Sequence, residues 1–149
     1  MTLEPALRPL VDALTDTQLF AVTLYGEARS EPIEGIVAVA SVIRNRMGTR
    51  DVKSVCLEPD RFACWSPAAG KKNHDRLVSL VTHLANKQEA TDPKARQCIG
   101  VATCVLQGYF SDNTDGATDF HKAAIVPRPA WARDRLPLKQ RGSNVFYKR

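Results

Sequence analysis

Tyr25-Gly26-Glu27-Ala28-Arg29-Ser30-Glu31-Pro32 is the stretch that decides the fold, because one apolar helix is predicted to end in it and another to begin. Upstream, Thr15-Asp16-Thr17-Gln18 is typical of a capping box that opens the first helix. Downstream, apolar residues recur as they would on one face of a second helix: Ile33, Ile36, Val37, Ala40, Ile43 and Met47. Ser30 is predicted to cap this second helix, with Glu31 and Pro32 in its first turn.

Glu27 is the candidate acid of this stretch. It falls in the last turn of the first helix, where the helix dipole disfavours a negative charge. If the carboxyl is also partly buried, its pKa is raised, as that of a general acid has to be. The competing interpretation is a solvent-exposed glutamate at a helix end, and position alone favours that interpretation.

The length and composition of the chain predict one globular domain over residues 1–149. The 149 residues are 44% hydrophobic and 25% charged, which is ordinary for a folded domain with a real core. No stretch approaches the roughly 18–20 apolar residues that span a bilayer, so no stable membrane insertion is expected. Residues 1–5 lack the basic and apolar regions of a signal peptide. The protein is therefore expected to be soluble, to be made in the cytoplasm, and to need a separate route out.

Basic residues are concentrated at the C-terminal end. The chain carries a net charge of +5, but residues 121–149 hold eight basic residues against Asp134 alone, a net charge of +7. Such a segment favours an anionic partner, whether nucleic acid, acidic lipid or a carboxylate-bearing cell wall. A solvated basic surface without a partner is the alternative.

The cysteines and histidines do not predict a metal site. No C-x-x-C pair occurs, and the histidines show no ligand spacing: His74, His83 and His121. No metal and no cofactor are therefore expected. Cys56 and Cys64 flank a loop and could form a disulfide, whereas Cys98 and Cys104 point in different directions on one helix. Buried free thiols are the expectation for all four.

The remaining segments complete a mainly α (α+β) fold, a bundle of helices with a small β-element near the C-terminus. The predicted elements are a helix over 2–14, an irregular segment over 49–73, a helix over 75–90, a helix that Asp92-Pro93 opens and Gly108 ends, a turn at 115–116, an extended segment over 117–121 and a strand over 142–147.

Five stretches taken together resemble a known family, the SleB/CwlJ-type cell-wall hydrolases, which include spore-cortex-lytic enzymes and phage endolysins. In chain order they are Tyr25–Pro32, Val39–Arg46, Phe62–Trp65, Gly116–His121 and Asn144–Tyr147. The resemblance covers the chain from about Asp16 to Tyr147. It implies a mainly helical fold like that of lysozymes and lytic transglycosylases. It also implies an enzyme that cuts peptidoglycan between N-acetylmuramic acid and N-acetylglucosamine.

The family's lytic transglycosylases use one catalytic glutamate, which falls on Glu27. The acid protonates the leaving oxygen, the 6-hydroxyl of muramic acid attacks, and the ionised glutamate takes the hydroxyl proton. Ordinary glycosidases need a second carboxylate, so a hydrolytic muramidase is the alternative. Glu31 is then a possible electrostatic partner, although a structural role at the helix start competes, and Glu34 is expected at the surface.

Further substrate contacts are expected along a saccharide groove. Trp65 and Phe120 could stack on sugar rings or pack in the core. Thr118 could hydrogen-bond an N-acetyl group or orient Glu27. Asn45 has either a structural role at its helix end or a place in the groove, and Tyr25 faces either the core or the site. The chain departs from the family at two positions. Members often have histidine or another aromatic residue where this chain has Asp119, and asparagine where it has Lys122.

The expected partners are peptidoglycan glycan strands and, through the basic C-terminal part, an anionic envelope surface. Nucleic acid is not expected as a partner. The protein is expected to be a monomer. Release through a holin would suit an endolysin. Two other classes remain open. An amidase would need zinc or an activated cysteine, and a non-catalytic polyanion-binding module would use the basic segment alone.

Overall fold

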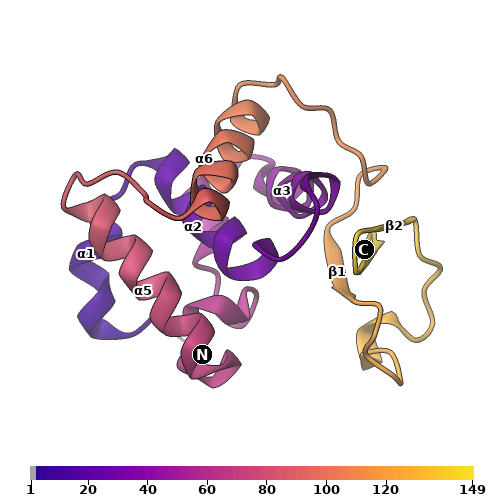
Figure 1. Ribbon diagram of the computed structural model, residues 1–149. Coiled ribbons are helices and arrows are strands. Elements are labelled where there is room, and N and C mark those ends of the chain that lie inside the picture. The colour runs from indigo at the N-terminus through magenta and orange to yellow at the C-terminus, as the bar shows by residue number, and fades with distance from the viewer. Residues whose placement is uncertain (1–2) are drawn as a thin grey trace.

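The computed structural model describes residues 3–149, and the predicted class, mainly helical with a small C-terminal sheet, is confirmed. Helices occupy the chain up to residue 106, and a three-stranded sheet lies to one side of them (Figure 1). The helical elements are η1 Pro5–Leu7, α1 Arg8–Asp12, α2 Asp16–Ala28, α3 Ile33–Met47, α4 Val52–Cys56, η2 Ala63–Trp65, η3 Pro67–Ala69, α5 Lys71–Ala85, α6 Pro93–Leu106 and η4 Ala130–Ala132, and the strands are β1 Asp119–Lys122, β2 Lys139–Arg141 and β3 Asn144–Tyr147.

Helix α2 is the centre of the helical part, and it packs against α3, α4, α5 and α6. Its start is the predicted capping box. The Gln18 N–H donates to Thr15 Oγ1 at 3.1 Å, and the Thr15 N–H donates to Gln18 Oε1 at 2.9 Å. Its middle is buried all round, as a helix surrounded by others should be: Leu19, Phe20, Ala21, Val22, Thr23, Leu24 and Tyr25. The last turn of α2, with Glu27, is thereby fixed in the helical core.

The junction between α2 and α3 differs from the prediction. The N-cap of α3 is Pro32 with no side-chain cap, so Ser30 does not cap the helix and Glu31 and Pro32 precede its first turn. The Glu31 N–H donates to the carbonyl of Ala28 at 3.0 Å, which tightens the turn. The end of α3 is as predicted, because Gly48 adopts a φ of 50° there.

The other helices show where local signals were strong. Asp92 caps α6 by accepting from the Lys94 N–H at 2.9 Å, as predicted. Helix α5 begins at Lys71 and ends at Ala85, several residues earlier than predicted. Within 49–73, predicted to be irregular, Asp51 caps the short helix α4, whose apolar residues are buried against α2 and α3. The predicted helix over 2–14 is instead a 3-10 turn followed by the short α1, and position 2 lies outside the described residues.

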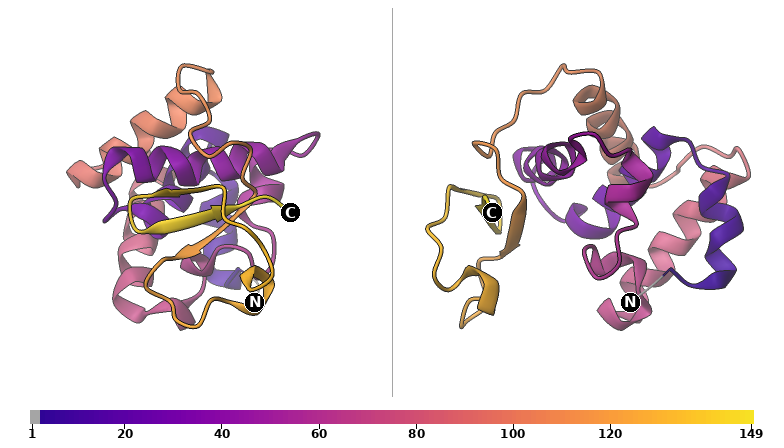
Figure 2. Two further views of the ribbon diagram at one scale, coloured as in Figure 1. Left: turned by 90° about the vertical axis from the view of Figure 1, so that its right-hand side faces the viewer. Right: turned by 180° about the vertical axis from the view of Figure 1, so that it is seen from behind.

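The sheet is antiparallel, with strand order β1-β3-β2 and Phe120 paired to Phe146. The predicted strand over 142–147 begins later, because Gly142 and Ser143 form the turn between β2 and β3. The Asp115-Gly116 turn has the expected positive φ values, 59° and 85°, but it leads into β1 and does not join two strands. The sheet lies beside α3, as Figure 2 shows from two sides.

The four cysteines are free thiols, and Cys56, Cys64 and Cys98 are buried as expected, whereas Cys104 is only half-buried. Among residues 3–149, no helix has both the length and the apolar character needed to cross a membrane.

Candidate active site

Glu27 lies in a hollow between the helical part and the sheet, with a volume of about 230 Å³, which we call the Glu27 groove. The groove is built from α2, α3, the segment after α4, β1, η4 and the C-terminal residue, and is lined by Glu27, Val42, Arg46, Asp60, Arg61, Phe62, Thr118, Asp119, Phe120, Trp131 and Arg149. Two of the predicted substrate-binding residues, Thr118 and Phe120, therefore share a groove with the predicted acid.

Glu27 as a whole residue is half-buried at the end of α2. Burial raises its pKa from 4.5 to about 7, against the opposing effects of hydrogen bonds from Cys64 and the positive charge of Lys122. The Cys64 backbone N–H donates to Glu27 Oε2 at 3.3 Å. The pKa rises in the direction that the sequence predicts, with burial as its main cause. A carboxyl with this pKa is partly protonated at neutral pH and can donate a proton.

Gly26 explains how η2 reaches Glu27. A Cβ at this position would lie 2.4 Å from Cys64 Cβ and 2.9 Å from Leu77 Cδ1, closer than atoms can approach. Only glycine therefore lets η2 contact the last turn of α2, and this contact places the Cys64 N–H against Glu27.

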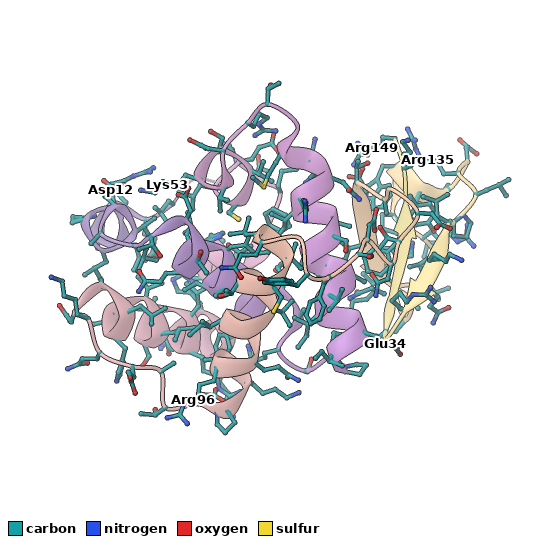
Figure 3. The ribbon with its side chains drawn as sticks, turned by 90° about the horizontal axis from the view of Figure 1, so that it is seen from above. Asp12, Glu34, Lys53, Arg96, Arg135 and Arg149 are labelled. Carbon is teal, nitrogen blue, oxygen red and sulfur yellow. The ribbon has the colours of Figure 1, made fainter. Side chains whose placement is uncertain are left out.

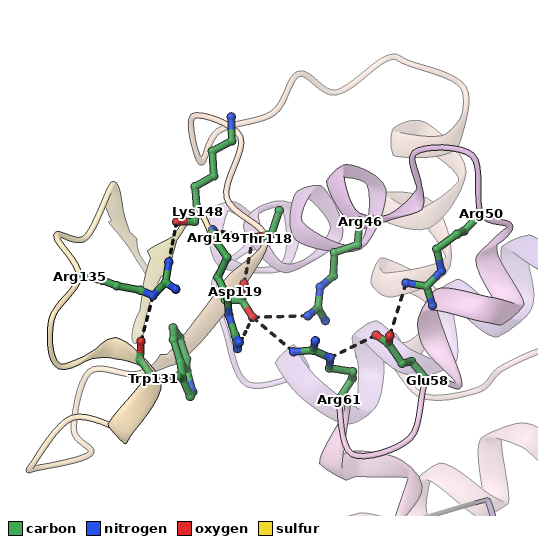
Figure 4. Close-up of polar contacts among 10 residues, drawn as sticks. All are labelled: Arg46, Arg50, Glu58, Arg61, Thr118, Asp119, Trp131, Arg135, Lys148 and Arg149. Carbon is green, nitrogen blue, oxygen red and sulfur yellow. Dashed lines mark hydrogen bonds and ion pairs between the residues drawn. The ribbon is translucent and has the colours of Figure 1, made fainter.

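Asp119, which also lines the groove, is the centre of a charged cluster. Its carboxylate is 7% exposed and pairs with three arginines, at 2.9 Å from Arg149, 3.4 Å from Arg46 and 3.7 Å from Arg61 (Figure 4). Thr118 Oγ1 donates to the same carboxylate at 2.9 Å and accepts from the Arg149 N–H at 3.1 Å. The cluster joins α3, the segment after α4, β1 and the C-terminus around the groove.

Aromatic residues form another part of the groove wall. Phe120 is half-buried and packs on Phe146, with ring centroids 5.6 Å apart. Trp131 is half-buried, and the Arg149 guanidinium lies over its ring at 5.0 Å from the centroid. Sequence reasoning missed Trp131, because it lies in an irregular segment between prolines with no periodic pattern. Phe62 had a signal, since it belongs to the same Phe62–Trp65 stretch as the predicted Trp65.

Trp65, Tyr25 and Asn45 are not in the Glu27 groove. Trp65 is 6% exposed and packs in the core, which was the competing interpretation, so its ring faces are not free to stack on a sugar. The Tyr25 hydroxyl donates to Asp92 at 2.5 Å, and burial together with this bond raises its pKa to about 12. Asn45 donates to Asp112 and to the carbonyl of Ala117, both at 2.9 Å, and so holds the loop that leads into β1.

Glu31 is buried outside the groove and holds the sheet. Its carboxylate accepts from the Ser143 N–H at 3.0 Å, from Ser143 Oγ at 2.7 and 2.8 Å, and from Asn144 Nδ2 at 3.0 Å. Lys122 Nζ lies 3.9 Å from the same carboxylate. The predicted partner of the acid therefore connects the α2–α3 junction to the turn between β2 and β3.

Metal ligands are not gathered anywhere in the described part of the chain. Over residues 3–149, no group of three or more His, Cys, Asp or Glu side chains is placed to hold a metal ion.

Known proteins resemble most of this chain. Residues 30–147 match the cell wall hydrolase family, in a region that starts three residues after Glu27. A spore cortex-lytic enzyme of Oceanobacillus iheyensis is 51% identical over 139 residues, and one of Halalkalibacterium halodurans is 49% identical over 135 residues. These alignments cover 89% and 88% of this chain, which spans only 41% and 34% of those relatives.

Solved structures agree with the family match. The catalytic domain of the Bacillus cereus SleB protein superposes with a TM-score of 0.58 and 28% identity, covering 89% of each chain. The catalytic domain of the germination-specific lytic transglycosylase SleB from Bacillus anthracis gives 0.57 and 27%, covering 89% of this chain and 93% of that one. Both the sequence and its three-dimensional arrangement lead to the same conclusion: the chain belongs to the cell wall hydrolase family.

Proposed function

We propose that this protein degrades peptidoglycan as a lytic transglycosylase, with residues 1–149 as one catalytic domain and Glu27 as the single general acid and base. The bond cleaved is the glycosidic bond between N-acetylmuramic acid and N-acetylglucosamine. Family membership and the names of the relatives and of the similar structures support an enzyme of the cell wall. The observation that carries the mechanism is the raised pKa of Glu27, about 7, within a groove.

The reaction needs only one carboxyl. Protonated Glu27 gives its proton to the glycosidic oxygen as the bond from that oxygen to the muramic acid C1 breaks. The 6-hydroxyl of the same sugar then bonds to C1 and closes an anhydro ring, and its proton returns to the Glu27 carboxylate. No water is consumed, and the acid ends in its starting form.

A hydrolytic muramidase is the second candidate, because two further carboxylates line the groove, Asp60 and Asp119. Hydrolysis would need one of them to activate water or attack the sugar. The Asp119 carboxylate already accepts from Thr118 and pairs with three arginines, which favours a structural role. Glu31 is engaged by Ser143 and Asn144, and Glu34 is exposed, so neither favours the two-carboxylate mechanism.

Sugar rings have aromatic partners in the groove. We propose that Phe120 and Trp131, which share it with Glu27 and are half-buried, contact the apolar faces of the sugars. The amidase alternative is disfavoured, because burial raises the pKa of the Cys64 thiol well above 9.0 and so suppresses the nucleophilic thiolate.

Mass spectrometry of soluble products from purified peptidoglycan tests the proposal. Wild type is expected to release fragments ending in 1,6-anhydromuramic acid, and Glu27→Gln is expected to lose at least about 100-fold in rate. Glu34→Gln, which changes an exposed carboxyl, is the matched control and should match wild type. Reducing muramic ends would establish the muramidase instead. Free stem peptides with intact glycan would establish an amidase.

A further inference from the structure

Exposed apolar side chains are concentrated in one segment, residues 123–138, which we call the outer loop. Among residues 3–149, six large apolar side chains are exposed, and four of them belong to the outer loop: Ile125, Val126, Leu136 and Leu138. Val126 is 87% exposed and Leu136 is 91% exposed. Because the loop is about a tenth of the chain, this clustering is more than the scatter of single apolar residues that surfaces normally show.

The same segment carries positive charge. Arg128, Arg133 and Arg135 are all exposed, and Asp134 is the loop's one acidic residue. Further cations lie on β2, at Lys139 and Arg141, and at the C-terminus, at Lys148 and Arg149. Figure 3 shows Arg149 with Arg135 at the sheet end of the molecule. The outer loop therefore carries both exposed apolar side chains and exposed cations.

Two sets of contacts anchor the outer loop to the sheet. Ala132 is buried, and Trp131 packs edge-on against His121 and Tyr147, with ring centroids 5.8 and 5.2 Å away. The Leu138 N–H donates to the carbonyl of Phe146 at 2.8 Å, which fixes the far end of the loop on β3. Figures 1 and 2 show the outer loop at the sheet end of the molecule, beyond the helical core.

We propose that the outer loop docks the protein reversibly on an anionic lipid bilayer. Exposed apolar side chains gain from entering the boundary between headgroups and acyl chains, and neighbouring arginines gain from anionic headgroups. A glycan strand or nucleic acid would use the cations but would leave Val126 and Leu136 in water. Trp131 joins the loop to the Glu27 groove, so docking would place the groove close to the membrane surface.

Sedimentation with vesicles tests this inference on the full chain. Wild type is expected to bind vesicles of phosphatidylglycerol and phosphatidylcholine, and to bind phosphatidylcholine alone far more weakly. The double variant Val126→Ser/Leu136→Ser should lose about tenfold or more in affinity, because both apolar contacts are removed. Arg128→Gln/Arg133→Gln should lose about fivefold for each cation. Tyr109→Ser is the matched control, since Tyr109 is 76% exposed outside the loop.

Several results would overturn the inference. They are equal binding to both kinds of vesicle, no binding to either, or full binding by the Val126→Ser/Leu136→Ser variant. If the Val126→Ser/Leu136→Ser variant lost binding to purified sacculi but bound vesicles like wild type, the wall polymer would be the partner, and the inference would also be overturned. Glu27→Gln should bind vesicles like wild type, so failure of the proposed chemistry and failure of membrane docking give separate results.

Discussion

The backbone N–H of Cys64 donates a hydrogen bond to the Glu27 carboxylate, with 3.3 Å between Cys64 N and Glu27 Oε2. This bond stabilises the ionised form and lowers the pKa of Glu27, but burial outweighs it and sets the pKa at about 7. The acid is thus held between two protonation states near neutral pH, as an acid that must also become a base requires. Gly26 makes the approach of Cys64 possible.

Lytic activity should fall as the pH rises above about 7, because the protonated fraction of Glu27 then falls about tenfold for each pH unit. The positive charge of Lys122 lowers the pKa of Glu27, so Lys122→Met should move this decline to higher pH. Rates of sacculus clearing across pH, for both proteins and for Lys72→Met, measure the effect. Lys72 is exposed on α5 and is not among the charges that act on Glu27, so an identical shift in that variant would contradict the assignment.

Glu27 should also make the protein less stable at high pH. Its pKa is raised from 4.5 to about 7 on folding, so the folded state binds more protons between these values and the free energy of unfolding falls as pH rises through them. Glu27→Gln lacks this titration. The stability of wild type relative to the variant should decline by about 1–3 kcal/mol between pH 4 and pH 8. Urea unfolding at several pH values measures it, and a constant difference would show that Glu27 has an ordinary pKa.

Gly26→Ala should destabilise the protein and reduce activity. The added methyl group would overlap with Cys64 and Leu77, so η2 has to move away from α2, at a cost of about 1–3 kcal/mol. Gly100→Ala is the matched control, because a Cβ at that position of α6 meets nothing within 4 Å. The control should be neutral or slightly stabilising, since alanine favours helix. Thermal unfolding and lytic rates of both variants measure these effects. Equal stability of the two variants would mean that η2 can shift to accommodate the added methyl group without cost.

Glu31→Ala should destabilise the protein by about 2–4 kcal/mol, because the buried Asn144 amide and the Ser143 N–H lose their acceptor. Glu34→Ala, which removes an exposed carboxyl close by in sequence, should change the free energy of unfolding by less than about 0.5 kcal/mol. Glu31→Gln keeps one acceptor oxygen, so its loss of free energy of unfolding should lie between those of Glu31→Ala and Glu34→Ala. If Glu31→Gln lost lytic activity while its free energy of unfolding stayed unchanged, Glu31 would have a role in the reaction.

Asp119→Asn should loosen the wall of the groove, because three arginines lose their shared carboxylate. We expect a loss of about 1–3 kcal/mol, reduced from the value for a fully buried pair because Arg61 and Arg149 are more than a third exposed. Asp115→Asn is the control: Asp115 is exposed, pairs with Lys139 at 3.4 Å, and has a positive φ that asparagine accepts. Urea midpoints compare the two, and equal midpoints would show that the cluster does not hold the groove.

The sequence by itself determined the elements whose signals are local. The capping box at Thr15, the Asp92 cap and the Gly48 end act within at most four positions along the chain, so the start of α2, the start of α6 and the end of α3 could be predicted. The position of Glu27 in the last turn of α2 follows from the same local physics. The five stretches that carry the family resemblance were also visible without a structure.

Only the tertiary structure decided what surrounds Glu27. The partners of Glu31 lie 112 and 113 positions away, and no local pattern distinguishes a carboxylate that caps a helix from one that holds a distant turn. Arg46, Arg61 and Arg149 meet at Asp119 from three separate segments. The choice of Trp131 over Trp65 for the groove likewise depends on how the sheet packs beside α3. Such contacts join residues far apart in the chain, so folding brings them together and sequence spacing does not reveal them.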